Sequence, residues 1–231
     1  MTVALDGPRL QAKRGRATAL VVFLHGYGAD GNDLIEIGYQ WRSLLPTAAF
    51  VSPHAPELCA ASPMGRQWFA LSSQSASDRA GAEARWNGAV KARAAIDDFL
   101  DAELNRLGLD DSRLALVGFS QGAMMAMHVG LRRRMAPAAI VGYSGMLIGA
   151  DRLSEARALD ARGAPPPILL IHGDQDPLIP VDAMFAAAQA LGGADVPTEW
   201  HLSAGVGHGI DGGGLHHGGL FLARAFGKLV R

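Results

Sequence analysis

Short apolar segments recur along the chain, and each is bounded by Gly, Pro or Ser. Most of these segments are apolar at nearly every position and do not alternate with polar residues. This pattern is typical of strands in a sheet that is covered on both faces. We therefore expect six strands, and they lie at residues 19–25, 48–52, 113–119, 138–144, 167–173 and 198–204.

Longer stretches between these strands have the helical spacing of apolar residues. We expect helices at residues 32–45, 86–108, 121–134, 180–191 and 215–230. The second helix is the clearest, and Gly108 provides a stop after it. Its expected apolar face consists of Val90, Ile96, Phe99, Leu100, Leu104 and Leu107. The repeated order of strand, helix and strand predicts a mostly parallel sheet with right-handed crossovers and helices on both faces.

Residues 53–85 break this rhythm, because they carry Pro, Gly and Ser with little periodicity. We expect an irregular segment here, and a loop of this length in a compact domain is usually functional or mobile. Its apolar members either close the rim of the core or form the wall of a substrate pocket over the strand ends. They are Met64, Trp68, Phe69 and Leu71.

Composition narrows the class of protein. A chain of 231 residues with 49% hydrophobic and 19% charged residues is globular, and we expect one domain over residues 1–231. The formal net charge is −1, and the longest basic run, Arg132 to Arg134, closes an expected helix, where cations suit the helix dipole. We therefore expect no nucleic-acid partner.

Cysteine content and hydropathy exclude further classes. A single cysteine, Cys59, rules out an intramolecular disulfide framework and a Cys-rich zinc site, so we expect no metal. No apolar run is long enough to span a bilayer, and no leader-like segment opens the sequence. We expect a soluble, cytoplasmic protein without an integral membrane segment. An apolar surface could support a homodimer as well as a monomer, and both stay open at this stage.

The segment "GFSQG", residues 118–122, points to nucleophilic chemistry. An apolar strand precedes it and a helix follows, and in such a corner the flanking Gly118 and Gly122 relieve crowding around a strained serine. We therefore expect Ser120 to be a nucleophile. The competing serine, Ser144 in "GYSGM", lacks the second spaced glycine and a following helix.

A serine nucleophile needs a base and an acid that orients the base. In this strand-to-helix arrangement the chain order is Ser, then Asp or Glu, then His, each on a loop at the carboxyl end of a strand. The loop "HGDQDP" offers Asp174 and Asp176, and spacing alone does not decide between them, since Asp beside Gly is also a common turn former. His208 in "GVGHGI" has the order and loop position expected of the base. Other roles suit the remaining histidines better. His25, His172 and His201 lie on or beside expected strands, where we expect hydrogen-bonded structural roles. We expect His128 to be packed or at the surface of its helix, and His216 and His217 to lie at a solvated helix end, while His54 opens the irregular segment and has no assigned role.

Backbone donors for a tetrahedral oxyanion have two expected sources. One is the N–H of the residue after the nucleophile, Gln121, at the start of a helix. The other is the glycine-rich loop at residues 23–33, "FLHGYGADGND", in which Asn32 or Asp33 is expected to cap the next helix.

Four segments, "LHGYGADGNDLIEI", "GFSQGAMMAM", "HGDQDPLIPV" and "GVGHGI", together resemble the phospholipase/carboxylesterase family of α/β-hydrolases. That family includes bacterial carboxylesterases and acyl-protein thioesterases. The resemblance covers nearly the whole chain and implies an α/β-hydrolase fold, a mostly parallel sheet with helices on both faces and no large cap domain. It also implies no metal or organic cofactor.

The resemblance also implies roles for particular residues. Ser120 would be the nucleophile, Asp176 the orienting acid and His208 the base, with Tyr27 and Gln121 as backbone oxyanion donors. "GRQWFAL" is similar to a block near the family's substrate cleft, which favours the pocket interpretation of residues 64–71. "SGMLIG" is similar to a block that lines the acyl side, which would make Met146 and Leu147 pocket walls.

The function that follows is a serine carboxylesterase acting on small-molecule esters, with thioesters or lysophospholipids as further substrates. An acyl-protein thioesterase, an acyltransferase or an amide hydrolase would use the same residues. A non-catalytic binding protein on a hydrolase scaffold is the alternative from another class. Residues 209–219 have no assigned role at this stage.

Overall fold

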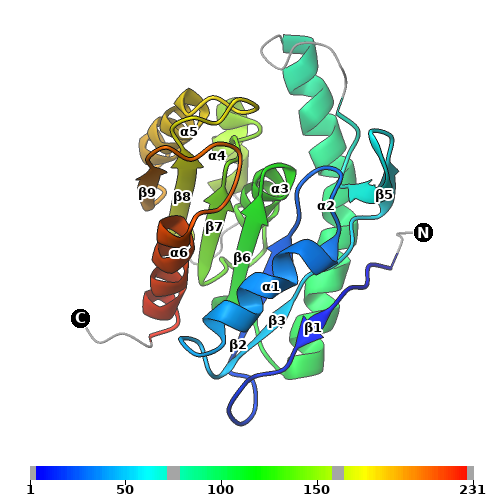
Figure 1. Ribbon diagram of the computed structural model, residues 1–231, viewed down its shortest axis with the longest axis vertical. Helices are drawn as coiled ribbons and strands as arrows, with labels where there is room; N and C mark the ends of the chain where they lie inside the picture. Colours follow the sequence, from blue (N-terminus) through cyan, green and yellow to red (C-terminus); the bar gives the residue numbers. More distant parts are fainter. Residues whose placement is uncertain (1–3, 72–78, 158–163, 228–231) are drawn as a thin grey trace.

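A seven-stranded sheet forms the centre of the computed structural model, which describes residues 4–71, 79–157 and 164–227 (Figure 1). The strand order is β1-β3-β2-β6-β7-β8-β9, and every neighbouring pair is parallel except β1 with β3. The predicted mostly parallel sheet is therefore confirmed. The strands are β1 (Arg9–Leu10), β2 (Ala19–Leu24), β3 (Ala48–Val51), β6 (Leu114–Phe119), β7 (Ala139–Tyr143), β8 (Ile168–Gly173) and β9 (Thr198–Ser203).

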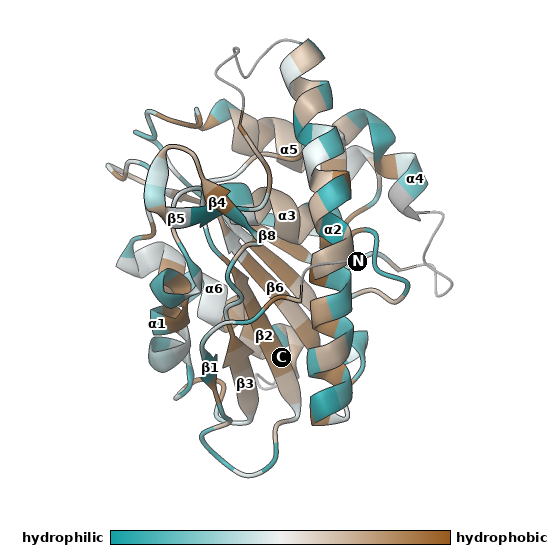
Figure 2. Ribbon diagram, turned by 90° about the vertical axis from the view of Figure 1, so that its right-hand side faces the viewer, coloured by the Kyte–Doolittle hydropathy of each residue, from teal (hydrophilic) through white to brown (hydrophobic). Residues whose placement is uncertain are grey.

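Helices cover both faces of this sheet. The helix bounds are α1 (Gly31–Trp41), α2 (Arg79–Leu107), α3 (Gln121–Gly130), α4 (Leu153–Arg157), α5 (Asp182–Gly193) and α6 (Gly212–Ala225). Short 3₁₀ turns lie at η1 (Asp111–Arg113) and η2 (Ala150–Arg152). One hydrophobic core lies between the sheet and α2, α3 and α5, and the other lies between the sheet and α1 and α6. In Figure 2 the central strands β2, β3 and β6 have mostly hydrophobic colours, whereas α2 carries polar and apolar positions along its length.

The two cores explain why the strands are apolar without alternation. In β2 all six residues are buried, with Leu20, Val22 and Leu24 in one core and Val21 and Phe23 in the other. Successive side chains of a strand point to opposite faces, so a strand between two cores needs apolar residues at every position.

The irregular segment expected at residues 53–85 has more order than predicted. It contains a hairpin of β4 (Glu57–Cys59) and β5 (Ser62–Gln67), and α2 begins at Arg79 instead of 86. Residues 72–78 lie outside the described residues. Backbone hydrogen bonds join Arg66 to Gly28 and Ala29, so the hairpin is stabilised by a loop distant in sequence, and local periodicity does not reveal it.

Three further expectations need correction. Val90 is 48% exposed, because small residues such as Ala89 and Ala92 form much of the buried face of α2. Helix α3 ends at Gly130, and beyond it Arg132 and Arg133 are buried, so the basic run is not a set of solvated cations at a helix end. The cap of α1 is neither Asn32 nor Asp33, and it is provided by Asp30, which accepts from the N–H of Asn32.

The glycine-rich segment before and within α6 allows this helix to lie close to the sheet. A Cβ atom added at Gly218 would lie 2.1 Å from the hydroxyl oxygen of Tyr143. That hydroxyl donates to the carbonyl of Gly214 (3.2 Å), and the Trp41 indole donates to the carbonyl of Leu215 (3.0 Å). Any larger side chain at Gly218 would push α6 away from the sheet.

No helix among the described residues has the length and hydrophobicity that a transmembrane span requires.

Candidate active site

Ser120 occupies the corner between β6 and α3. The strand ends at Phe119 and the helix begins at Gln121, so Ser120 alone makes the turn. Its backbone has φ 54° and ψ −115°, in a region that residues other than glycine rarely adopt. Strain of this kind persists only where the surroundings hold it, and it is concentrated at functional sites.

The flanking glycines are required by close backbone approach. A Cβ atom at Gly122 would lie 1.8 Å from the carbonyl oxygen of Leu24, and one at Gly118 would lie 2.2 Å from the carbonyl oxygen of Gly122. Neither neighbour is a flexible side chain that could move aside. The sharp corner at Ser120 therefore depends on both glycines.

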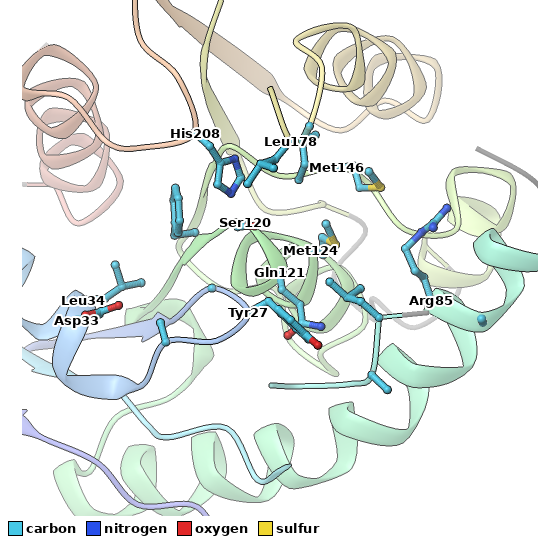
Figure 3. Close-up of a pocket in the computed structure, with 17 residues that line it drawn as sticks. Tyr27, Asp33, Leu34, Arg85, Ser120, Gln121, Met124, Met146, Leu178 and His208 are labelled. Carbon is cyan, nitrogen blue, oxygen red and sulfur yellow. The ribbon is translucent and has the colours of Figure 1, made fainter. Parts of the chain in front are cut away.

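Ser120 and His208 line the same cavity, which has a volume of about 410 Å³ (Figure 3). The His208 ring packs against Phe119, the residue before the serine, with ring centroids 4.9 Å apart. Most of the other side chains that line the cavity are apolar. They include Leu34, Leu71, Met124, Met146, Leu178 and Ile179.

Asp176 lies behind His208 and holds its ring. Nδ1 of His208 is 2.7 Å from Oδ2 of Asp176, whose side chain is fully buried. The other carboxylate oxygen accepts from the N–H groups of Leu178 (2.8 Å) and Ile179 (2.9 Å). Burial by itself raises the pKa of this carboxyl, but the hydrogen bonds from Ile179, His208 and Leu178 outweigh it, so the pKa lies below its ordinary value. Asp176 is therefore held as a carboxylate, the form that can accept the Nδ1–H of an imidazole.

Asp174 and Ser144, the alternatives at the sequence level, contact the loop that carries His208. Asp174 accepts from the N–H of Gly205 (2.7 Å), and the hydroxyl of Ser144 is 3.4 Å from the carbonyl of Gly209. Ser144 is fully buried and does not line the cavity. Both residues fix the ends of the loop around His208.

The backbone N–H groups of Tyr27 and Gln121 have no hydrogen-bond partner among the described residues. Both residues line the cavity, and the position of a Cβ on Gly26 is only 3.5 Å from Cβ of Ser120. The loop of Tyr27 is fixed from behind, because the N–H of Gly28 donates to the carbonyl of Arg66 (2.9 Å).

The side chain of Gln121 has a role that sequence reasoning missed. It is fully buried, its amide oxygen accepts from the N–H of Trp68 (3.0 Å), and its amide nitrogen donates to the carbonyl of Phe69 (2.7 Å). The residue after Ser120 thus joins the corner to the segment that follows the β4–β5 hairpin. No local signal in the sequence predicts such a contact between residues 53 positions apart.

Two buried histidines have structural roles, as their strand positions predicted. Nε2 of His25 accepts from the N–H of Ala55 (3.0 Å), and burial lowers the pKa of His25, which favours this neutral acceptor. Nε2 of His172 lies 2.8 Å from the carbonyl of Ile179 and 3.3 Å from Oδ2 of Asp176, so this ring supports the loop of Asp176.

Of the six residues expected to form pocket walls, the structure brings Leu71 and Met146 to the cavity. Met64 is 91% exposed on the hairpin, and Trp68 and Phe69 are buried in the core next to α2 and α3. Leu147 packs against the same core. These four side chains are not part of the cavity lining, because Met64 is exposed to solvent and the other three pack in or against the core.

Other lining residues were not predicted from the sequence. Met124 lies one helical turn after Ser120, so the helical spacing could have revealed it. Leu178 and Ile179 follow Asp176 directly, and Leu34 comes from α1. Among the described residues, no three His, Cys, Asp or Glu side chains are arranged to hold a metal ion.

Comparison with known proteins finds similarity to esterases and thioesterases. A family model described as phospholipase/carboxylesterase matches residues 5–223. Acyl-protein thioesterase 1 of Schizosaccharomyces pombe is 30% identical over 177 residues, which cover 75% of each chain. Esterase YpfH of Escherichia coli is 26% identical over 198 residues, which cover 84% of this chain and 78% of that protein.

Solved structures with a similar fold include an esterase and a carboxylesterase. The crystal structure of esterase PE8 is 41% identical, with a TM-score of 0.88 over 96% of this chain and all of that one. The carboxylesterase of Bacillus cereus is only 17% identical but has a TM-score of 0.74, which is a likeness of fold.

Proposed function

The chain belongs to the phospholipase/carboxylesterase family of α/β-hydrolases, and on this basis we propose that it hydrolyses carboxylic esters through Ser120, His208 and Asp176. One observation carries the proposal. The imidazole of His208 lines the cavity together with Ser120, and its Nδ1 atom lies 2.7 Å from a carboxylate oxygen of the buried Asp176. This is the arrangement that a serine nucleophile requires of its base.

In the proposed reaction, the Ser120 hydroxyl attacks the acyl carbonyl while His208 takes its proton. Asp176 keeps the ring oriented and stabilises the imidazolium that forms. His208 then gives the proton to the leaving alcohol or thiol, and an acyl-serine remains. Water activated by His208 attacks this ester and releases the carboxylic acid, which regenerates Ser120.

The backbone N–H groups of Tyr27 and Gln121 would stabilise the oxyanion. Two observations support this role: both N–H groups lack partners among the described residues, and both residues line the cavity together with Ser120. A single donor of this kind contributes about 10²–10³ to turnover. Since the donors belong to the backbone, the loop at Tyr27 must keep its geometry for the reaction to proceed.

The cavity supports an acyl group of apolar character. Its volume of about 410 Å³ and its lining of Leu, Ile and Met side chains suit medium-length or aromatic acyl chains. Thioesters are the second candidate, because relatives at 25–30% identity are named acyl-protein thioesterases. Matched oxygen esters and thioesters of graded acyl length would separate the two.

The decisive test uses p-nitrophenyl butyrate and a fluorophosphonate probe. We expect turnover by the wild type, none above background with Ser120→Ala, and a single label that peptide mass spectrometry places on Ser120. The matched variant Ser144→Ala should still be labelled. Equal turnover by wild type and Ser120→Ala would refute the proposal, and a failure of the probe to react would favour a binding protein.

An acyltransferase or an amide hydrolase could use the same three residues. An acyltransferase would pass the acyl group to an alcohol or amine instead of water, and an amide hydrolase would release an amine instead of an alcohol. Product analysis in the presence of competing alcohols or amines separates these reactions from ester hydrolysis. If the main product is a new ester or amide, the protein is an acyltransferase and the proposed hydrolysis is wrong.

A further inference from the structure

A second cavity lies against α2, and His128 of α3, Arg132 and Glu155 of α4 complete its lining. Its volume is about 390 Å³, and it shares no lining residue with the first cavity. The two cavities use neighbouring positions: Arg85 and Met124 line the first, and Trp86 and His128 line the second. The reaction proposed above uses none of the residues of the second cavity.

His128 is a buried polar group in this cavity without a partner. Its side chain is 1% exposed, and neither ring nitrogen has a hydrogen-bond partner among the described residues. Burial, together with the nearby charges of Arg132 and Arg93, lowers its pKa to about 3, so the ring is neutral and has one donor and one acceptor. Buried polar atoms without partners are rare, because each costs free energy.

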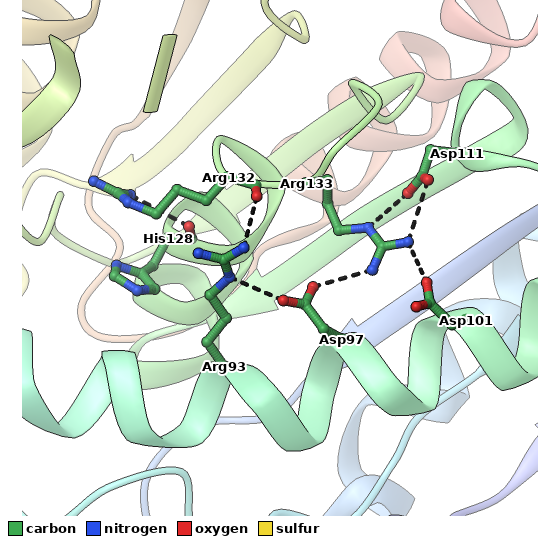
Figure 4. A network of polar contacts seen from close by, with 7 residues as sticks. All are labelled: Arg93, Asp97, Asp101, Asp111, His128, Arg132 and Arg133. Carbon is green, nitrogen blue, oxygen red and sulfur yellow. Dashed lines mark hydrogen bonds and ion pairs between the residues drawn. The ribbon is translucent and has the colours of Figure 1, made fainter. Parts of the chain in front are cut away.

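The neighbouring arginines Arg132 and Arg133 differ sharply in their partners, as Figure 4 shows. Arg133 has three carboxylates, with Asp111 at 2.7 Å, Asp97 at 3.0 Å and Asp101 at 2.5 Å. This guanidinium is fully neutralised by its own chain.

Arg132 is 5% exposed, yet no carboxylate of the described residues lies within ion-pair distance of it. Among the described residues, its N–H groups reach the carbonyls of His128 (3.3 Å) and Arg152 (3.4 Å) and no carboxylate. Burial and the charge of Arg93 lower its pKa, but a guanidinium remains charged at neutral pH. A buried cation without a counter-ion is costly, and an anion would offset this cost.

The other side chains of the cavity limit the anion that fits. The Trp86 ring lies 4.9 Å from Cζ of Arg132 and 5.1 Å from the His128 ring, and Val90 and Ala94 add apolar surface. Two carboxylates are among the described lining residues, Asp97 and Glu155. Glu155 is exposed and acts on Arg132 through its charge from beyond ion-pair distance.

Asp97, the other carboxylate at this cavity, is already occupied. It pairs with Arg93 at 2.9 Å and with Arg133 at 3.0 Å. It is therefore not available to neutralise Arg132.

We propose that this second cavity binds a small organic carboxylate with an aromatic or apolar body. The carboxylate accepts hydrogen bonds from Arg132 and from the N–H of the His128 ring, and the body packs against Trp86 and Val90. Charge-assisted bonds from a guanidinium are short and directional, which suits a carboxylate. Glu155 competes with the ligand for Arg132.

The test uses benzoate as the probe and the four tryptophan indole N–H signals as reporters in two-dimensional NMR. Trp86 reports the second cavity. Trp68, whose indole donates to the His25 carbonyl, reports the region of the first cavity. Trp41 and Trp200 lie elsewhere and serve as internal controls. The variant Trp86→Phe identifies the Trp86 signal.

We expect benzoate to shift the Trp86 signal in a saturable way while Trp41 and Trp200 do not move. Because the interaction is charge-assisted, benzamide should bind at least about tenfold more weakly, and Arg132→Met should weaken benzoate binding to a similar degree. The surface variant Glu155→Gln should tighten benzoate binding, since it removes the internal competitor.

Three results would overturn the proposal. They are a Trp86 signal that does not respond up to the solubility limit of benzoate, a response of Trp68 alone, and equal binding of benzoate and benzamide. If Arg132→Met does not fold, Glu155→Gln and the benzamide comparison still decide. Benzoate affinity that is unchanged in a folded Arg132→Met would also overturn the proposal, since it would exclude Arg132 as the recognition group. None of these readouts depends on catalysis, so they are separate from the test of the esterase.

Discussion

Nδ1 of His208 lies 2.7 Å from a carboxylate oxygen of Asp176, although the two residues are 32 positions apart in the chain. Asp174, only two positions from Asp176, contacts Gly205 instead. The two carboxylates of this loop therefore have different roles. Asp176 orients the His208 ring, and Asp174 binds the backbone of the loop that carries His208.

This difference predicts that the two aspartates respond differently to the same substitution. Asp176→Asn should lower kcat by about 10³–10⁴, because an amide does not orient the imidazole or stabilise its charged form as a carboxylate does. Asp174→Asn should retain most of the activity, since an amide oxygen can still accept from Gly205. Steady-state kinetics on p-nitrophenyl butyrate checks both, and similar losses in the two variants would contradict the assignment.

The buried amide of Gln121 should contribute to stability as well as to activity. Gln121→Met keeps the backbone N–H but leaves the N–H of Trp68 and the carbonyl of Phe69 without partners, at about 1–3 kcal/mol for each buried group. We expect a lower free energy of unfolding in urea and a reduced kcat. The exposed variant Gln40→Met should change the free energy of unfolding by no more than about 0.5 kcal/mol. Wild-type stability in Gln121→Met would show that the contact is dispensable.

The corner at Ser120 makes a steric prediction with an internal control. Gly122→Ala places a methyl group 1.8 Å from the Leu24 carbonyl oxygen, so the backbone must shift and the protein should lose both stability and activity. Gly192 lies in α5 with no atom within 4 Å of an added Cβ, so Gly192→Ala should raise the free energy of unfolding by up to about 1 kcal/mol. Thermal unfolding of both variants gives the comparison, and a Gly122→Ala protein as stable as the wild type would be inconsistent with this geometry.

Glu103 makes a prediction about pH. Burial alone raises the pKa of its carboxyl, but hydrogen bonds from Arg9 (2.8 Å) and Arg106 (2.6 Å) outweigh burial, so the pKa is lower in the folded protein than in the unfolded chain. Such a group stabilises the fold above its unfolded pKa of about 4.3, and this stabilisation is lost as the pH falls through the lower folded value.

We therefore expect Glu103→Gln to reduce the free energy of unfolding at neutral pH by about 1–3 kcal/mol, with little effect on kcat. In acid, below the folded pKa, wild type and variant should converge. Urea titrations across this range measure the difference, and the exposed Glu36→Gln is the control. A difference that stays constant with pH would argue against an ionised Glu103 as its source.

The layered α/β architecture can be predicted from the pattern of apolar residues alone. A strand between two cores is apolar at every position, and that pattern is local enough to read along the chain, as in β2 and β6. The corner at Ser120 was also predictable, since its strand, glycines and helix are adjacent in sequence.

The contacts between groups far apart in the chain, in contrast, are visible only in the folded protein. Spacing left Asp174 and Asp176 open, and the pairing with His208 depends on how the loops after β8 and β9 come together at one edge of the sheet. The β4–β5 hairpin was missed because its pairing with Gly28 and Ala29 leaves no periodic pattern.

The ion-pair partners of the basic run after α3 were also not predictable from the sequence. Arg132 and Arg133 are adjacent and chemically identical, but one meets three carboxylates and the other meets none among the described residues. Local rules act over a few residues and fix the form of the backbone. The partner of a buried charge is set by the packing of elements far apart in the chain, and so only the folded structure reveals it.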